Sequence, residues 1–289
     1  MKNLTLLTVL LVAACQPDTK NLERKVDQIA QDQRKIMDML AKGGGAGAAG
    51  AAQPRAPRPE PDRTKTYSVP IDNDPFDGPA DAKITLVKAY DYACPYCEKV
   101  RGTMDDLHKK YGNDIRVVYK QLVVHPRNAM ASALAFCAAG KQGKHKDMDR
   151  LFWDKGFNAR QMDMSDITPA EGGGQPQKCW DAADGCKNVV SYAQELQLDV
   201  NKFKADMKEC QGPVNNDMKH LQALLVGSTP AFFINGRFVS GAVPIENFVA
   251  VIDEEMKKAN EKIAQGTPPG AYYQTWVVEK GLKTVELPK

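Results

Sequence analysis

Two cysteines separated by two residues, Cys94 and Cys97, are the side chains of this sequence best suited to redox chemistry. An apolar run at 84–90 precedes them and is typical of a buried strand, and a helical pattern begins at the pair. At a helix N-terminus, the unpaired backbone N–H groups and the macrodipole favour the thiolate of Cys94. The spacing lets Cys97 fold back to close or break a disulfide, so the pair predicts thiol–disulfide exchange.

Two other interpretations of the pair have less support. A zinc site would need two further ligands, but the chain has no second Cys-x-x-Cys, and its four histidines are scattered: His108, His125, His145 and His220. A structural short-loop disulfide rarely starts a helix after a buried strand. Pro95 suits the early helical position, where its missing N–H costs nothing. We therefore expect no metal and no cofactor.

A second feature lies far along the chain, at Thr229-Pro230. These residues precede an apolar stretch at 231–234 and the turn Asn235-Gly236, which is a strong hairpin signal. A proline at the start of a buried strand is a candidate for a cis peptide bond. The alternative is an ordinary trans turn.

Together the two motifs resemble a known family. Residues 91–97 (DYACPYC) and 227–236 (GSTPAFFING), with a long helical interval between them, are similar to the DsbA-like branch of the thioredoxin superfamily, the bacterial extracytoplasmic disulfide oxidoreductases. The resemblance covers about 66–264. It implies a thioredoxin-like α/β fold, a cis Pro230 facing the cysteines, Thr229 offering its backbone to an extended substrate segment, and Cys94 attacking while Cys97 resolves. It also implies protein substrates with thiols or disulfides and a membrane redox partner.

One departure from the family concerns Lys88. Six residues before the first cysteine, the superfamily often carries a buried acid that handles the proton of the second cysteine, whereas this chain has a lysine. Its amine either lies near the pair, which would make the pair more oxidising, or turns outward as a solvated strand residue, which we favour slightly.

Other neighbours of the pair are candidates for tuning its potential. The dipeptide Pro95-Tyr96 lies between the cysteines, and His125 could lie near the active face, although we expect a capping or packing role for this histidine. Asp91 and Glu98 are expected to be exposed charges.

Four cysteines remain within the folded part: Cys137, Cys179, Cys186 and Cys210. Three pairings are possible. We favour Cys137–Cys210, at helix positions typical of the family, with Cys179–Cys186, which enclose one short loop. One bridge with two buried free thiols is the alternative. So many cysteines are unusual for a reducing compartment unless they bind metal.

The N-terminus predicts export and a lipid anchor. Residues 1–14 contain Lys2 and an apolar run too short to span a bilayer, which indicates a signal peptide. The sequence at 12–15 (VAAC) resembles a bacterial lipobox, which implies acylation of Cys15; an ordinary secretory signal is the alternative. We expect the protein on the periplasmic side of a bacterial membrane, with the outer membrane slightly favoured because Gln16 replaces a retention aspartate.

The remaining chain divides by composition. Residues 15–42 hold a short heptad pattern, with apolar residues at positions 22, 26, 29, 36 and 40, which predicts either a coiled coil that forms a homo-oligomer or a stalk helix. Residues 43–65 are rich in Gly, Ala and Pro, as in a flexible linker. The folded domain is expected at 66–264 with a helical insertion at about 126–225, and the tail 265–289 is expected to dock through Tyr272, Tyr273 and Trp276.

Within the folded domain, periodicity predicts alternating strands and helices. Strands are expected at 66–71, 84–90, 115–122, 231–234 and 237–240. Helices are expected from the cysteine pair to Tyr111, and at 128–139, 146–153, 179–196, 200–225 and 245–263.

The charge of the chain excludes one class of partner. The net charge of +3 comes from 39 basic and 36 acidic residues without a long block of one sign, so nucleic acid is not expected. The favoured function is a protein dithiol oxidase. An isomerase or reductase of the same fold, possibly oligomeric through residues 22–40, is the alternative, and a non-catalytic binding module is a third.

Overall fold

The computed structural model describes residues 25, 27–28, 31–35, 59–71, 73–158, 167–168 and 177–285. The chain divides into two compact units, Met1–Pro57 and Arg58–Lys289. In the first unit, the described residues between 25 and 35 are helical and exposed. The predicted signal peptide, Cys15, the five apolar heptad positions and most of the linker lie outside the described residues.

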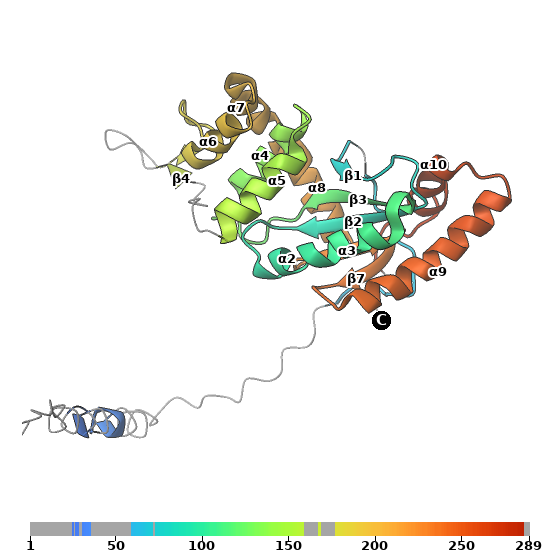
Figure 1. Ribbon diagram of the computed structural model, residues 1–289, viewed down its shortest axis with the longest axis horizontal. Helices are drawn as coiled ribbons and strands as arrows, with labels where there is room; N and C mark the ends of the chain where they lie inside the picture. The colour runs from blue at the N-terminus through green and yellow to red at the C-terminus, as the bar shows by residue number, and fades with distance from the viewer. Residues whose placement is uncertain are drawn as a thin grey trace, which may run out of the picture. The chain divides into compact units, whose positions relative to one another are not determined.

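A five-stranded mixed sheet forms the centre of the second unit (Figure 1). The strand order is β1-β3-β2-β6-β7, with β2 and β3 parallel and the other neighbours antiparallel. The strands are β1 (Phe76–Asp77), β2 (Ile84–Tyr90), β3 (Ile115–Gln121), β6 (Ala231–Ile234) and β7 (Arg237–Ser240). The predicted strands at 84–90, 231–234 and 237–240 coincide with β2, β6 and β7.

Both faces of the central strand β2 are buried, because helices cover the sheet on each side. On one face, Ile84 and Leu86 pack with residues of α3 (Arg101–Tyr111) and α9 (Ile245–Ala264). On the other face, Val87 and Ala89 pack with residues of α8 (Gln211–Ala223), α10 (Pro269–Tyr272) and the π-helical segment Tyr273–Val278. Tyr272 and Tyr273 of the tail are buried in this second cluster.

The insertion between β3 and β6 is helical and has its own core. It consists of α4 (Met130–Gly140), α5 (His145–Leu151), a π-helical segment (Phe152–Asn158), the small hairpin β4 (Ile167–Thr168) and β5 (Gln177–Lys178), α6 (Lys187–Glu195), α7 (Val200–Glu209) and α8. Figure 1 shows α4 to α7 gathered to one side of the sheet. Tyr90, Tyr92, Cys94 and Cys97 belong to the core of the insertion, so the cysteine pair lies where sheet and insertion meet.

Several predicted helix bounds were wrong. The predicted helix from the cysteine pair to Tyr111 is divided at Val100 into α2 (Pro95–Lys99) and α3. The predicted helix at 200–225 is divided at Cys210, where Pro213 lacks the N–H that a continuous helix needs. The predicted helix at 179–196 begins only at Lys187, because 179–186 form a loop closed by a disulfide.

The predicted edge strand at 66–71 was also wrong. Thr66 and Tyr67 make only isolated bridges, to Arg237 and Leu282. Pro70 has no N–H to continue a ladder. The edge beside β3 is instead the two-residue strand β1. Among the described residues, no helix has both the length and the apolar character needed to cross a bilayer.

Candidate active site

Cys94 lies at the N-terminus of α2, immediately after the turn that ends β2. Its backbone is extended, with φ −91° and ψ 116°, and Pro95 begins the helix. The backbone N–H of Cys97 donates to the carbonyl of Cys94 at 3.1 Å, which folds the chain back at the pair. Both thiols are free and buried, whereas Pro95 and Tyr96 between them are exposed.

The loop before β6 faces the first thiol. The Thr229–Pro230 peptide bond is cis, and Cys94 Sγ lies 3.3 Å from the carbonyl oxygen of Thr229, to which it donates when it is protonated. The register of the sheet explains this contact, because Ala89 pairs with Ala231 across β2 and β6 and sets Pro230 beside the end of β2. Residues 94, 97, 229 and 230 therefore form one group, as the sequence motifs suggested.

The pKa values of the two thiols are shifted in opposite directions. The pKa of Cys94 is lowered to about 5 by a hydrogen bond from Cys97, by the Thr229 side chain and by backbone N–H groups of Cys97 and Tyr96, which together outweigh burial. The pKa of Cys97 is raised well above its usual range by burial and by the neighbouring Cys94. At neutral pH the pair therefore holds a thiolate at Cys94 and a thiol at Cys97.

Asp91 was expected to be an exposed charge, and this was wrong. Its carboxylate is buried and accepts four hydrogen bonds: from the backbone N–H of Ala93 at 2.7 Å, Val124 at 2.7 Å and His125 at 2.8 Å, and from Nδ1 of the His125 ring at 3.1 Å. Its carbonyl also accepts from Cys94 N at 3.1 Å. Asp91 thus ties the cysteine turn to the loop after β3.

His125 packs against this carboxylate, and its side chain is 47% exposed. Its partner is Asp91; the described hydrogen bonds do not link its ring to Cys94. Glu98 is partly exposed and accepts from Asn158 Nδ2 at 3.1 Å.

Lys88 is buried, which corrects the expectation of a solvated side chain. Its Nζ lies 4.9 Å from the centroid of the Tyr90 ring and 5.5 Å from that of Tyr119. The faces of aromatic rings attract an ammonium group. Burial raises the pKa of Asp149, and the positive charge of Lys88 acts against this effect by lowering it. Side chains alternate along a strand, so Lys88 shares the face of Leu86 and Tyr90.

A buried hydrogen-bond chain beside the pair was not foreseen. Gln121 Nε2 donates to Tyr90 Oη at 2.5 Å, Tyr90 Oη and Tyr92 Oη are 3.2 Å apart, and Tyr92 Oη donates to Asp149 Oδ1 at 2.8 Å. Asp149 also accepts from Trp153 Nε1 at 3.0 Å. The two tyrosines two residues apart are a signal in the sequence, but Asp149 comes from the insertion and only tertiary structure brings it here.

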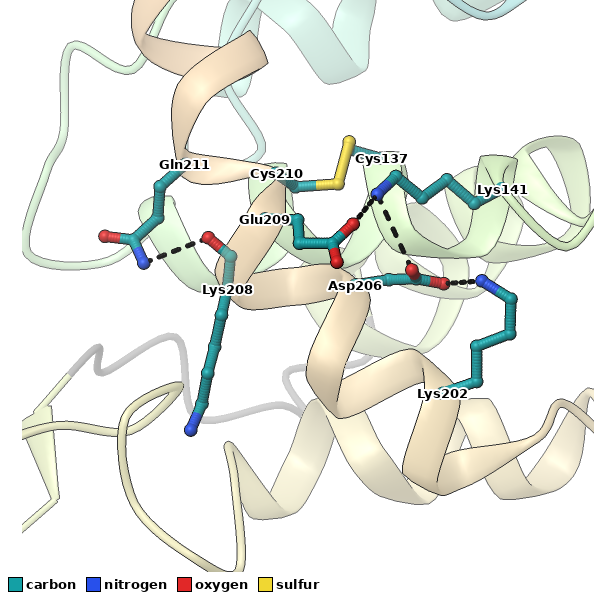
Figure 2. The surroundings of a disulfide bond; sticks show 8 residues. All are labelled: Cys137, Lys141, Lys202, Asp206, Lys208, Glu209, Cys210 and Gln211. Atoms are coloured by element: carbon teal, nitrogen blue, oxygen red, sulfur yellow. Dashed lines mark hydrogen bonds and ion pairs between the residues drawn. A yellow bond between two sulfur atoms is a disulfide. The ribbon is translucent and has the colours of Figure 1, made fainter.

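The other four cysteines form two disulfides. Cys137 bonds to Cys210 across α4 and the end of α7, and Cys179 bonds to Cys186 around a short loop; these are the pairs favoured from the sequence. Figure 2 shows Lys141 beside the first bridge, its ammonium between Asp206 and Glu209. Neither bridge includes a cysteine of the reactive pair. Among the described residues, no group of three or more His, Cys, Asp or Glu could hold a metal ion.

Comparison with known proteins decides the family. Residues 71–254, more than half of the chain, match a family model described as thioredoxin. The chain belongs to the thioredoxin family. Both the cysteine pair and the cis-proline loop of this thioredoxin-family protein lie within the matched residues.

Solved structures show the same fold. The α-DsbA1 protein of Wolbachia pipientis is similar with a TM-score of 0.52 at 16% identity, over 68% of this chain and 96% of that one. The oxidised BdbD of Bacillus subtilis is similar with a TM-score of 0.50 at 16% identity, over 69% of this chain and 100% of that one. The fold of this thioredoxin-family chain is therefore the DsbA-like form, with helices inserted into the thioredoxin sheet.

Curated relatives match by sequence over part of their length. A protein of Herminiimonas arsenicoxydans described as the Na(+)/H(+) antiporter NhaA is 31% identical over 181 residues, which cover 61% of this chain and 24% of the relative. A protein of Salinispora arenicola described as Na(+)/H(+) antiporter NhaA 1 is 30% identical over 192 residues, covering 64% and 25%. The chain thus spans about a quarter of the length of these relatives.

Proposed function

We propose that this protein is an extracytoplasmic thiol–disulfide oxidoreductase that oxidises other proteins through Cys94 and Cys97. The observation that carries the proposal is the group formed by an acidic thiol, a buried partner thiol and the cis-proline loop, with Cys94 Sγ 3.3 Å from Thr229 O. The thiolate is the nucleophile in exchange, so a thiol with a pKa of about 5 is reactive at neutral pH.

The reaction uses both cysteines in turn. A substrate thiolate attacks Cys94 Sγ of the oxidised pair, which forms a mixed disulfide and releases Cys97 as a thiolate that takes up a proton. A second substrate thiolate then attacks the substrate sulfur of the mixed disulfide and releases Cys94 as a thiolate. The substrate loses two electrons and gains a disulfide, and the pair becomes a thiolate and a thiol.

The acidity of Cys94 favours the oxidising direction. A stabilised thiolate stabilises the reduced form of the pair and makes Cys94 the better leaving group, so the disulfide is given up readily. The lowered pKa of Cys94 at about 5 supports this direction. The dipeptide Pro95-Tyr96 lies between the two cysteines and is expected to affect their reduction potential. The buried ammonium of Lys88 acts on Asp149, which accepts a hydrogen bond from Tyr92, two residues before Cys94.

The surface around the pair suits an extended polypeptide. Tyr96 is 61% exposed beside Cys94, and Gly227 and Ser228 are exposed before the cis-proline loop. An extended substrate segment contacts the backbone of Thr229 in the manner of an added strand, with its cysteine directed at Cys94. Backbone contacts of this kind accept many sequences, as a catalyst of varied protein substrates requires.

The sequence supports a location outside the cytoplasm. We propose that residues 1–14 direct export and that Cys15 carries a lipid on the periplasmic side of a bacterial membrane. Of the two membranes, we slightly favour the outer one. Residues 43–65 then tether the folded domain to this anchor. A membrane protein of the disulfide-forming machinery accepts the two electrons of the reduced pair and restores the disulfide. Residues 22–40 form either a short coiled coil that makes the protein a homo-oligomer or a stalk helix.

An isomerase or reductase is the second candidate, favoured by the heptad pattern at 22–40, since an oligomer would present several reactive pairs to one scrambled substrate. The reduction potential separates the two. We expect a value of about −120 mV, measured against glutathione, for an oxidase, as for strong extracytoplasmic oxidants. A value of about −180 mV together with refolding of a scrambled protein would support the isomerase instead. Cys94→Ser abolishes exchange in both cases, and unchanged activity in that variant would eliminate both.

A further inference from the structure

A cavity of about 950 Å³ lies between the insertion and the sheet edge. Its walls come from residues 73–76, the end of β3, α4, the segment 141–145 that follows it and the first turns of α8. They include neither the reactive cysteines nor Thr229 and Pro230. The volume is at the upper end of the range of small-molecule sites, which is roughly 300–1,000 Å³.

One wall of the cavity is aromatic. Phe136 lies between Tyr119, with ring centroids 5.4 Å apart, and His145, with centroids 5.9 Å apart. Tyr119 and His145 are 6.4 Å apart. The two pairs that include His145 pack edge to face, and the Tyr119–Phe136 pair is tilted. A further ring can join such a cluster edge to face.

A buried hydrogen-bond acceptor without a partner lies in the same wall. Gln121 lines the cavity and is 3% exposed, yet its Oε1 has no hydrogen-bond partner in the structure. Tyr119 and Gln121 are two residues apart on β3 and so share a face. A buried acceptor without a partner is unfavourable, so a ligand that donates to it gains affinity.

The hydrogen bonds that connect Gln121, Tyr90 and Tyr92 determine which atom of the Gln121 amide has no partner. Tyr92 donates to Asp149, so Tyr92 accepts from Tyr90, and Tyr90 in turn accepts from the Gln121 amide. Only Nε2 can donate to Tyr90. Oε1 is therefore the unsatisfied atom, and it requires an N–H or O–H donor from a ligand.

The charges around the cavity do not favour an anionic ligand. Asp74 and Asp217 both line it, and both pair with the buried ammonium of Lys120, at 2.5 Å and 2.7 Å. The basic side chains of the lining, Lys141 and His145, already face acidic partners: Asp206 and Glu209 for the lysine and Asp77 for the histidine. A ligand carboxylate or phosphate would therefore meet acidic groups without a free cation to pair with.

We propose that this cavity binds a small neutral or cationic aromatic molecule whose N–H or O–H donates to Gln121 Oε1 while its ring packs against Tyr119, Phe136 and His145. The site is separate from the cysteine pair and does not depend on the proposed redox function.

Two matched probes isolate the hydrogen bond. Indole offers an aromatic ring with an N–H donor, and 1-methylindole offers nearly the same ring without the donor. Their affinities for the full-length protein are measured by ligand-detected NMR titration. We expect 1-methylindole to bind about fivefold to tenfold more weakly, the usual contribution of one hydrogen bond. No binding of indole, or equal binding of the two probes, would overturn the proposal.

Substitutions in the protein test whether the probe binds in this cavity. Gln121→Met removes the acceptor, so indole is expected to lose its advantage over 1-methylindole. A Cβ added at Gly212, which lines the cavity, meets no atom within 4 Å, so the backbone there accepts a side chain, and the ring of Gly212→Phe is expected to narrow the site. Gly102→Phe on α3 is the control, because Gly102 is equally open but lies outside the cavity. We expect indole to bind at least fivefold more weakly to Gly212→Phe only; equal affinities of the two glycine variants would contradict the site.

Discussion

Cys94 Sγ lies 3.3 Å from the carbonyl oxygen of Thr229, although 135 residues separate them in the chain. The antiparallel pairing of β2 with β6 brings the end of β2 beside the start of β6, and the cis Thr229–Pro230 bond lies directly before β6. A segment bound along Thr229 would present its own sulfur next to the most acidic thiol of the pair. The reactivity of this thiol, the turn that carries it and the stability of the insertion can each be tested.

The Thr229 hydroxyl is expected to stabilise the thiolate of Cys94. Its Oγ1 is buried and has no hydrogen-bond partner, so its O–H is available to the thiolate, and the Thr229 side chain lowers the pKa of both cysteines. Thr229→Val should raise the pKa of Cys94 by about 1, since a hydrogen bond to a charged group contributes about 1.5–3 kcal/mol. The pH dependence of alkylation by iodoacetamide measures this pKa. Ser228→Ala, at the exposed neighbour, is the control and should leave it unchanged.

The reduced protein should become more stable relative to the oxidised one as the pH rises from about 5 to about 9. The pKa of Cys94 is about 5 in the folded protein, against 9.0 ordinarily, so the unfolded chain binds more protons between these values. The contribution is complete above pH 9 and is lost as the pH falls through 5. Urea unfolding of both redox forms across this range measures it. Reduced Cys94→Ala should lack the trend, and an equal trend in that variant would rule out the thiolate as its cause.

Asp91 is expected to be essential for the stability of the cysteine turn. In Asp91→Asn, the new amide group must face one of the N–H donors that the carboxylate now accepts, so a buried donor loses its partner. We expect a loss of about 2–4 kcal/mol in the free energy of unfolding. Glu98→Gln, at the partly exposed neighbour, should cost less than about 0.5 kcal/mol. Equal effects of the two substitutions would show that the buried hydrogen bonds of Asp91 are not the cause.

The two structural disulfides should differ in their effect. Cys137 and Cys210 are 73 residues apart, whereas Cys179 and Cys186 are 7 apart. Cross-linking a longer loop removes more entropy from the unfolded chain, so replacing the first pair by alanine should cost about 4 kcal/mol and the second about 2 kcal/mol. Thermal and urea unfolding measure both. A larger loss for the short loop would contradict the loop-entropy explanation.

The periodic parts of the fold could be predicted from sequence, and the interactions between distant segments could not. The strand at 84–90 is a continuous apolar run and coincides with β2, whereas the two-residue β1 is too short to have a pattern. The loop at 179–186 contains enough polar and helix-compatible residues to resemble the helix that follows it, and only the bridge between Cys179 and Cys186 separates the two.

Within the site, residue types and spacing identified the cysteines, but side-chain burial depended on partners far away. Lys88 could have been placed from strand alternation, since it shares a face with Leu86 and Tyr90, but the rings that receive its ammonium include Tyr119 of another strand. The burial of Asp91 has a local signal in the sequence. An aspartate side chain often accepts a hydrogen bond from the backbone N–H two residues later, as Asp91 does from Ala93. The donors at Val124 and His125 became apparent only in three dimensions.

The most direct measurement is transfer of a disulfide from the oxidised full-length protein to a reduced, unfolded protein that carries two thiols. Free thiols in both proteins are trapped with acid and alkylating reagent at successive times and assigned by peptide mapping. We expect one disulfide to appear in the substrate as Cys94 and Cys97 become free, with no transfer by Cys94→Ser. If Cys94 and Cys97 stay bonded while the substrate thiols remain free, or if the substrate is oxidised equally well by Cys94→Ser, the central claim is wrong.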